Sequence, residues 1–410
     1  MGAGTARGGA CLLISGNVRK NMEFVVFAGV LLLLFIFMIV QELIQTKNQE
    51  KLFKKYLREN YGKEPPKEYS LERFARLGSY LERHKEEKQL DDITWNDLGM
   101  DEVFRRIDRT YSAAGEEYLY YTLRNISCGR EAMEHLEEVV NWLQEQEDIK
   151  VRIQLLMKRL GHLGKYSLYD YLDNLDYLGE RSNRKIVLGN LLYLPFLLLL
   201  FVQPAMGTIG SVLCMLWHIM TYFREKKVIE PYIISFAYVL RLIDVCEELE
   251  KQKIPVYRRE LDELREALKS LRELRRGSYW VMAGNQGKIG GNPLDILADY
   301  LRMILHLDIF QFNRMLEKLR KKTGQVETML AITGYLDMAI SVGGFRKSLE
   351  GYCIPKLEED TEKAFLHMKK GWHPLLSQPV KNSIRADRGI LLTGSNASGK
   401  STFLKMVAVN

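Results

Sequence analysis

IVLGNLLYLPFLLLLFVQPAMGTIGSVLCMLWHIMTYF, residues 186–223, is 38 residues long and contains no Asp, Glu, Lys or Arg. This length suits two membrane-spanning helices and is too great for one. Gln203-Pro204 divides the stretch near its middle, and an X-Pro pair favours a turn. The stretch therefore predicts a transmembrane hairpin over residues 186–223. The alternative is a buried helix pair in a soluble core, which the absence of a polar face at helical spacing disfavours.

A second apolar run, FVVFAGVLLLLFIFMIV, covers Phe24–Val40 and has 17 residues without a charge. This is at the short end for a membrane-spanning helix, although Gln41 and its neighbours extend it. A signal peptide is the competing interpretation, but the run is long for such a peptide and no A-x-A-like cleavage site follows it. We expect an uncleaved membrane anchor over residues 1–45, in a chain that starts at Met1 or at Met22.

Basic residues flank both predicted membrane segments. They are Lys47, Lys51, Lys54, Lys55 and Arg58 after the first segment, Arg181, Arg184 and Lys185 before the hairpin, and Arg224, Lys226 and Lys227 after it. Short segments rich in Lys and Arg stay on the cytoplasmic side of a membrane. We therefore expect a multi-pass membrane protein with a lipid bilayer as partner and with cytoplasmic soluble parts. The orientation of the N-terminus stays open, because Arg7, Arg19 and Lys20 oppose an external one.

The overall composition is that of a globular protein. Of the 410 residues, 47% are hydrophobic and 27% are charged, which excludes a chain disordered throughout. The net charge of +7 is compatible with anionic lipid or nucleic acid and demonstrates neither. The five cysteines form no CxxC pair, so they indicate reduced thiols and neither a zinc site nor a disulfide frame; they are Cys11, Cys128, Cys214, Cys246 and Cys353.

The soluble segments have mostly helical periodicity. Residues 46–92 are rich in Lys, Arg and Glu and predict a charged juxtamembrane stalk, divided by Pro65-Pro66 into two helical pieces. Residues 93–185 predict the first part of a helical core. Within it we expect a turn followed by a new helix at Ser112–Gly115, and one amphipathic helix over residues 131–160.

The second part of the helical core is predicted over residues 224–370. Helix is expected from residue 231 to residue 276, with an interruption at Pro255. Two further long helices are expected, Leu294–Leu319 and Gln325–Leu349. The glycines between Tyr279 and Pro293 do not have GxGxxG spacing, so this segment is interpreted as a connector.

The C-terminal segment, RGILLTGSNASGKSTFLKMVAVN, covers residues 388–410. Ile390–Leu392 predicts a short strand, Gly394–Ser401 matches GxxxxGK[ST], and an amphipathic helix follows. A strand, a glycine loop and a helix in this order are the context of a P-loop. Its backbone N–H groups and the positive end of its helix bind the phosphates of a nucleotide. A chance match is the alternative, which the flanking strand and helix disfavour.

ATP and Mg²⁺ are the predicted cofactors. We expect Lys400 to reach the β- and γ-phosphates and the Ser401 hydroxyl to ligate Mg²⁺. Asn396 can approach the γ-phosphate, and Thr402 lies near the α-phosphate. The complete set of predicted nucleotide-binding residues is Gly394, Asn396, Ser398, Gly399, Lys400, Ser401 and Thr402.

No catalytic residue is predicted. Hydrolysis requires a second Mg²⁺ ligand, usually an Asp, and a group that positions water, and both are expected after the P-loop. The sequence ends at Asn410. We therefore interpret residues 371–410 as the start of a C-terminally truncated α/β ATPase domain. ATPase activity is expected of a full-length form and not of this piece.

Three segments resemble the MutS family of DNA mismatch repair ATPases. GSNASGKST, residues 394–402, is similar to the family's G-x-N-x-x-G-K-S-T, and Gly371–Leu375 resembles the HP element upstream of it. IDRTYSAAGEEYLYYTL, Ile107–Leu123, resembles the start of the family's helical core. The resemblance covers about residues 93–185 and 224–410, with the hairpin inserted between them.

The resemblance implies a mainly α protein with a MutS-like helical core and the start of a P-loop ATPase domain. It implies ATP-dependent binding of DNA and a homodimer formed through the missing ATPase half. His373-Pro374 is expected to shape the start of that domain. Whether His373 acts as a base stays open, because a His before Pro is more often structural.

The chain also departs from the family. The mismatch-reading domain with its Phe-x-Glu wedge is absent, and residues 258–276 mix Arg with Glu and Asp, so no basic stripe supports DNA binding. The alternative function is a membrane-bound P-loop ATPase with a transport or scaffold role and without DNA binding. A structural membrane protein with a vestigial loop is disfavoured, because Lys400 and Ser401 are intact.

Overall fold

The computed structural model describes residues 36–41, 43–63, 69–86, 88–126, 129–163, 167–275, 293–358, 364–395 and 398–410. They belong to two units, Met1–Asn60 and Tyr61–Asn410. In the first unit, residues 36–41 and 43–60 are helical, and the apolar side chains of residues 36–40 are exposed. The remainder of the predicted anchor Phe24–Val40 lies outside the described residues, as does Pro65-Pro66.

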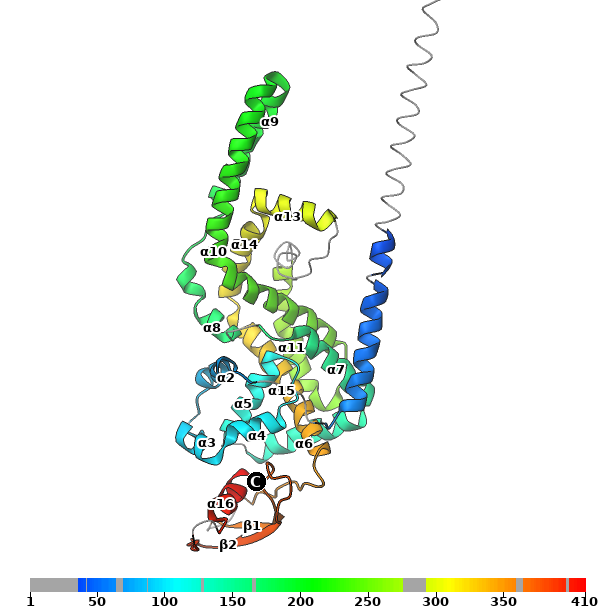
Figure 1. The fold of residues 1–410 in the computed structure, drawn as a ribbon, viewed down its shortest axis with the longest axis vertical. Coiled ribbons are helices and arrows are strands. Elements are labelled where there is room, and N and C mark those ends of the chain that lie inside the picture. Colours follow the sequence, from blue (N-terminus) through cyan, green and yellow to red (C-terminus); the bar gives the residue numbers. More distant parts are fainter. Residues whose placement is uncertain are drawn as a thin grey trace, which may run out of the picture. The chain divides into compact units, whose positions relative to one another are not determined.

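The second unit is mainly helical, as predicted (Figure 1). Its α-helices are α2 (Leu71–Arg83), α3 (Asp92–Leu98), α4 (Met100–Ile107), α5 (Ala113–Arg124), α6 (Arg130–Glu145), α7 (Glu147–Leu160), α8 (Leu168–Asp173), α9 (Arg184–Val202), α10 (Pro204–Glu250), α11 (Arg258–Leu271), α13 (Pro293–Leu305), α14 (Leu307–Arg320), α15 (Thr323–Lys347) and α16 (Lys400–Val409). Short 3₁₀ helices cover Leu175–Leu178, Pro255–Tyr257 and Arg272–Arg275.

Helix α15 is the centre of the helical core. Its apolar residues lie on all sides of the helix, including Val326, Leu330, Leu336 and Ile340, and all four are buried. Helices α5, α6, α7, α10 and α11 pack around it. A helix that is apolar all round requires such cover, because each exposed aliphatic side chain would forgo about 1.5–3 kcal/mol of burial energy.

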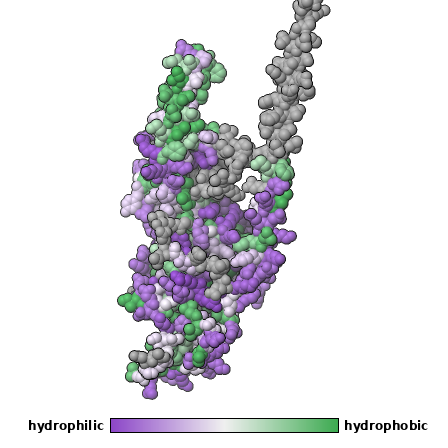
Figure 2. Space-filling view, in the orientation of Figure 1, coloured by the Kyte–Doolittle hydropathy of each residue, from purple (hydrophilic) through white to green (hydrophobic). Residues whose placement is uncertain are grey.

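Helices α9 and α10 form the predicted helical hairpin, with its turn at Gln203 (Figure 1). Pro204 begins α10, where its missing N–H costs no helical hydrogen bond. The side chains of α9 and of the first half of α10 are apolar and largely exposed, among them Leu198, Phe201 and Met220 (Figure 2, green). The hairpin therefore presents an apolar surface that the described residues leave uncovered.

Two described helices are long and apolar enough to cross a membrane, judged by length and composition alone. Of the most apolar 18 residues of each helix, 6% are buried in α9 and 72% are buried in α15. The burial of α15 is that of a core helix. The exposure of α9 has no such explanation within the described residues.

Polar contacts join the base of the hairpin to the core. Asn190 of α9 donates to the carbonyl oxygen of Leu305 at 3.1 Å, and the Tyr222 hydroxyl of α10 donates to Asp308 Oδ2 at 2.9 Å. Between the two helices, His218 Nε2 lies 3.2 Å from the Gly189 carbonyl oxygen. These contacts determine where along α9 and α10 the hairpin begins to extend from the core.

Three helix predictions were wrong in their boundaries. The helix expected over Leu294–Leu319 breaks at His306, which has a left-handed φ of 54° and separates α13 from α14. The helix expected over residues 131–160 divides at Gln146 into α6 and α7. The hairpin's second helix does not end near Phe223, since α10 continues without a break through Pro231 to Glu250.

The expected stalk over residues 46–92 is not solvated throughout. Leu77 of α2 is fully buried and Tyr80 is 6% exposed, because α2 packs against α5 and α8. The segment is therefore an amphipathic part of the core, and two of its arginines, Arg73 and Arg76, reach the buried Glu116 of α5. The stalk prediction rested on the many charged residues of this segment and did not take account of its apolar face.

The C-terminal segment contains two strands that the sequence did not predict. β1 (Leu366–Gly371) and β2 (Asn382–Ala386) pair in an antiparallel ladder, with a shift in register between Met368 and Gly371. The strand expected at Ile390–Leu392 is not formed, and these side chains are exposed. A strand requires a neighbour for its backbone hydrogen bonds, and within the described residues β1 and β2 pair only with each other.

We predict that Gly334→Ala destabilises the core. Helices α5 and α15 approach so closely that a Cβ at Gly334 would lie 2.6 Å from the Ala114 carbonyl oxygen. Relieving this clash requires a backbone shift, with an expected cost of about 1–3 kcal/mol in the free energy of unfolding.

Gly324→Ala is the matched control on the same helix, because nothing lies within 4 Å of its added Cβ. It should leave stability unchanged or raise it by up to about 1 kcal/mol. Thermal unfolding followed by circular dichroism measures both variants. Equal melting temperatures for the two would contradict the close approach of α5 and α15.

Candidate functional site

The last glycine of the predicted P-loop has a backbone conformation that favours glycine. Gly399 is the N-cap of α16 and has a left-handed φ of 85°, which is accessible to glycine at little cost. Its carbonyl oxygen accepts the first helical hydrogen bond, from Phe403 N at 2.9 Å. Within the loop, Ser398 N donates to the Ser395 carbonyl oxygen at 3.3 Å. The loop therefore turns sharply into a helix whose first N–H groups lack helical acceptors.

The polar side chains of the motif gather at this helix start. The Lys400 ammonium group folds back and donates to the carbonyl oxygens of Gly394 and Ser395. Ser401 and Thr402 are exposed in the first turn of α16. An ammonium group, two hydroxyls and the positive end of a helix form an arrangement suited to an anion. Asn396 of the predicted set lies outside the described residues.

The predicted HP element packs beneath α16. His373 is 7% exposed, and its Nδ1 accepts from Leu375 N at 3.3 Å. Burial, with a smaller contribution from Lys405, lowers the pKa of His373 below its ordinary value, so the ring is neutral at pH 7. The Trp372 carbonyl oxygen accepts from the Asn410 side chain at 2.9 Å. This His therefore has a packing role at the base of the P-loop helix.

No metal centre is evident in the part of the chain that the structure describes. It contains no group of three or more His, Cys, Asp or Glu side chains placed to hold a metal ion. Ligation of Mg²⁺ by Ser401 stays a prediction from the P-loop motif.

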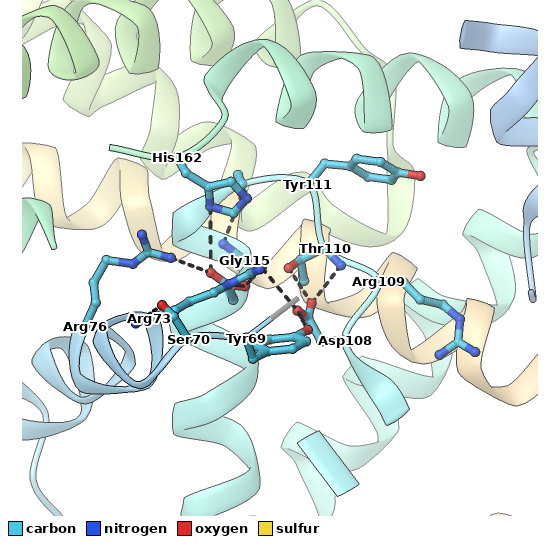
Figure 3. A network of polar contacts seen from close by, with 12 residues as sticks. Tyr69, Ser70, Arg73, Arg76, Asp108, Arg109, Thr110, Tyr111, Gly115 and His162 are labelled. Atoms are coloured by element: carbon cyan, nitrogen blue, oxygen red, sulfur yellow. Dashed lines mark hydrogen bonds and ion pairs between the residues drawn. The ribbon is translucent and has the colours of Figure 1, made fainter. Parts of the chain in front are cut away.

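The segment Ile107–Leu123 contains a buried polar network (Figure 3). Glu116 is fully buried and accepts from Arg73 Nε at 2.7 Å and from Arg76 Nη2 at 2.8 Å. Asp108 Oδ1 accepts from the backbone N and the hydroxyl of Thr110, at 2.9 and 2.6 Å. Buried carboxylates are tolerated only with such partners.

The start of α5 is capped from both directions. The Ser112 hydroxyl accepts from Gly115 N at 3.1 Å, which confirms the predicted turn and new helix. Asp337 of α15 accepts from the backbone N and hydroxyl of Ser112, at 2.8 and 2.6 Å. The carboxylate therefore ties the first turn of α5 to the central helix.

No family model matches the chain. MutS protein homolog 4 of Homo sapiens is 28% identical over 117 residues, which is 27% of this chain and 12% of that protein. DNA mismatch repair protein MutS of Leptospira interrogans is 30% identical over 119 residues, 26% of this chain and 14% of that protein. Part of the chain is similar to MutS proteins. The similar segment is less than one sixth of either relative's length.

The predicted residues lie in short sequence motifs, whereas the residues that contact them in the structure do not. Ser112, Gly115 and the glycine loop were visible as short motifs. Asp337 lies more than 200 residues from Ser112 in sequence and gave no signal, because an isolated Asp in an apolar helix has no distinguishing pattern. The Arg73 and Arg76 partners of Glu116 were interpreted as stalk charges.

We predict that Glu117→Gln flattens the pH dependence of stability. Glu117 is 3% exposed and its carboxyl accepts from the Ser167 hydroxyl at 2.9 Å. Burial raises its pKa from 4.5 to about 8, so the folded protein holds a proton that the unfolded chain releases. The contribution of this proton to wild-type stability is therefore fully present below pH 4.5 and is lost as the pH rises through about 8, by a few kcal/mol in total.

Unfolding at pH 5, 6.5 and 8 measures this effect. Glu117→Gln carries no proton to lose, so it should lose less stability between pH 5 and pH 8 than the wild type. Glu131→Gln, at an exposed position on α6, is the control and should follow the wild type. If Glu117→Gln and the wild type lost the same stability between pH 5 and 8, Glu117 would not be held protonated by burial.

Proposed function

We propose that this protein is a MutS-like, ATP-binding protein tethered to a membrane. The observation that carries the proposal is the P-loop motif Gly394–Ser401, whose last glycine has the left-handed backbone required to begin α16. The partial similarity to MutS proteins supports the proposal that the P-loop and the helical core are of the MutS type.

The residues present fit a nucleotide. Lys400 lies over the loop carbonyls, within reach of a phosphate placed at the helix start. Ser401 would hold Mg²⁺ through its hydroxyl, and Thr402 would contact the phosphate nearest the helix. Gly394, Asn396 and Ser398 belong to the same loop, in which backbone N–H groups would surround the phosphates.

We place the hairpin of α9 and the first half of α10 across the bilayer. Its exposed apolar side chains would be unfavourable in water at about 25 cal/mol per Å² but are well solvated by lipid. The run of about 17 residues in each helix extends for about 26 Å, close to the thickness of a bilayer's hydrocarbon core. The soluble parts on both sides of the hairpin then share the cytoplasmic side.

A second function, ATP binding without DNA, is favoured by the surface of α11. Basic and acidic side chains are mixed along its exposed face. Arg259 pairs with Glu263, and Arg265 pairs with Asp262 and with Glu250 of α10. Such a surface attracts DNA phosphates poorly. The relatives are named for mismatch repair, so DNA binding and homodimerisation remain part of the first proposal on resemblance alone.

We predict that Lys400→Ala weakens MgATP binding by at least about tenfold, because it removes a charge-assisted contact of roughly 1.5–3 kcal/mol. Fluorescent ATP titrated into the detergent-solubilised protein measures the affinity. Lys405→Ala is the matched control on the same helix and should bind as the wild type does. An unchanged affinity of Lys400→Ala for MgATP would contradict the assignment of the nucleotide site to Gly394–Thr402.

Duplex DNA binding across a salt series, with and without MgATP, separates the two functions. A MutS-type function predicts binding that weakens as salt rises and shifts with ATP. ATP binding without DNA binding, even at low salt, would reject the DNA function and retain the P-loop.

A further inference from the structure

We propose that four basic side chains at the base of the hairpin bind the phosphate groups of anionic lipids. These residues, the basic collar, are Arg184 and Lys185 of α9 and Arg224 and Lys227 of α10. The inference rests on the proposed membrane hairpin and adds a lipid class to it.

The four residues lie at one level of the hairpin. Arg181, next to the start of α9, forms an ion pair with Glu225 of α10, so the chain enters and leaves the hairpin side by side. About two turns further along, His218 contacts the carbonyl of Gly189. In Figure 2 polar side chains border the green hairpin where it joins the core. The collar therefore lies at the edge of the apolar surface.

The collar charges are not neutralised by the protein. All four side chains are exposed, and none forms an ion pair within the described residues. Arg181 differs, because Glu225 and Asn313 Oδ1 both accept from its guanidinium group. Lys226 also differs, because its ammonium group lies over the Tyr222 ring at 5.3 Å. The structure thus separates basic residues with protein partners from four that face outward.

The position of the collar matches a lipid headgroup layer. Ile186 follows Lys185 and Phe223 precedes Arg224, so the charges begin where the apolar surface ends. Trp217 is 49% exposed and lies two turns inside this edge, on the apolar surface of the hairpin. Each basic residue near an anionic leaflet raises affinity by about fivefold. Long Lys and Arg side chains also reach outward to the headgroups while their stems stay in lipid.

Trp217 provides the probe for the test. The protein is reconstituted into bilayers that contain a small fraction of acyl-brominated phosphatidylglycerol or acyl-brominated phosphatidylcholine, and quenching of Trp fluorescence reports which lipid lies beside the hairpin. We expect at least fivefold preference for phosphatidylglycerol in the wild type. In the variant Arg184→Gln, Lys185→Gln, Arg224→Gln, Lys227→Gln the preference should fall to about onefold. Trp217→Phe should lose the quenching and so validates the probe.

A matched control removes four exposed charges elsewhere. Lys251 and Lys253 follow α10, and Arg258 and Arg259 begin α11; all four are exposed, and their replacement by Gln should retain the wild-type lipid preference. Circular dichroism confirms that each variant is folded.

The outcomes are distinct. Equal lipid preference in the wild type and the collar variant overturns the collar and leaves the membrane hairpin in place. Absence of quenching by either brominated lipid overturns the membrane hairpin itself. If the collar variant instead loses binding to a soluble oligonucleotide and keeps its lipid preference, the four residues form a nucleic-acid surface and the lipid assignment is rejected.

Discussion

The structure depends on the continuity of α10. Its first half carries exposed apolar side chains such as Leu213 and Met220, and its second half is buried in the core through Phe236, Leu242 and Leu249. The first half of this one helix is therefore exposed, and its second half is part of the core. Pro231 lies between the halves and leaves the carbonyl of Lys227 without its helical donor, yet the helix does not end there. Because a helix is stiff, the placement of the hairpin and the packing of the core are determined together.

The core adds a second rigid connection. Asp337 of α15 holds the first turn of α5, while Glu116 binds two arginines of α2, so three helices share buried charges. Removal of one partner from such a network leaves a buried charge, at a cost of roughly 3–5 kcal/mol. Aliphatic packing around α15 provides the cohesion, and these carboxylates specify which helix ends meet.

The sequence predicted features that short motifs encode. The turn at Gln203-Pro204, the helix start at Ser112 and the glycine before α16 each rest on a backbone preference of a few neighbouring residues. Features imposed by tertiary contacts were not predictable. His306 adopts a left-handed backbone, which is uncommon for any residue other than glycine, and its ring Nε2 lies 3.3 Å from the Thr221 hydroxyl of α10.

The same distinction applies to α2 and to the candidate site. Leu77 is buried in a cluster with Trp95 of α3, Phe104 of α4 and Leu119 of α5, which the sequence of a charged segment does not reveal. The P-loop residues were predictable because phosphate binding requires glycine, lysine and hydroxyl groups at fixed spacing. The strand expected before that loop was not observed, since strand formation depends on a neighbour outside the motif.

The most direct test of the membrane account is the sidedness of the hairpin in sealed vesicles. Single cysteines at Tyr177, Gln203 and Glu230, all exposed positions, are placed in a cysteine-free background and treated with a membrane-impermeant thiol reagent. The account predicts that residues 177 and 230 react from one side of the membrane and residue 203 only from the other. Reaction of all three from the same side would contradict a hairpin that crosses the bilayer.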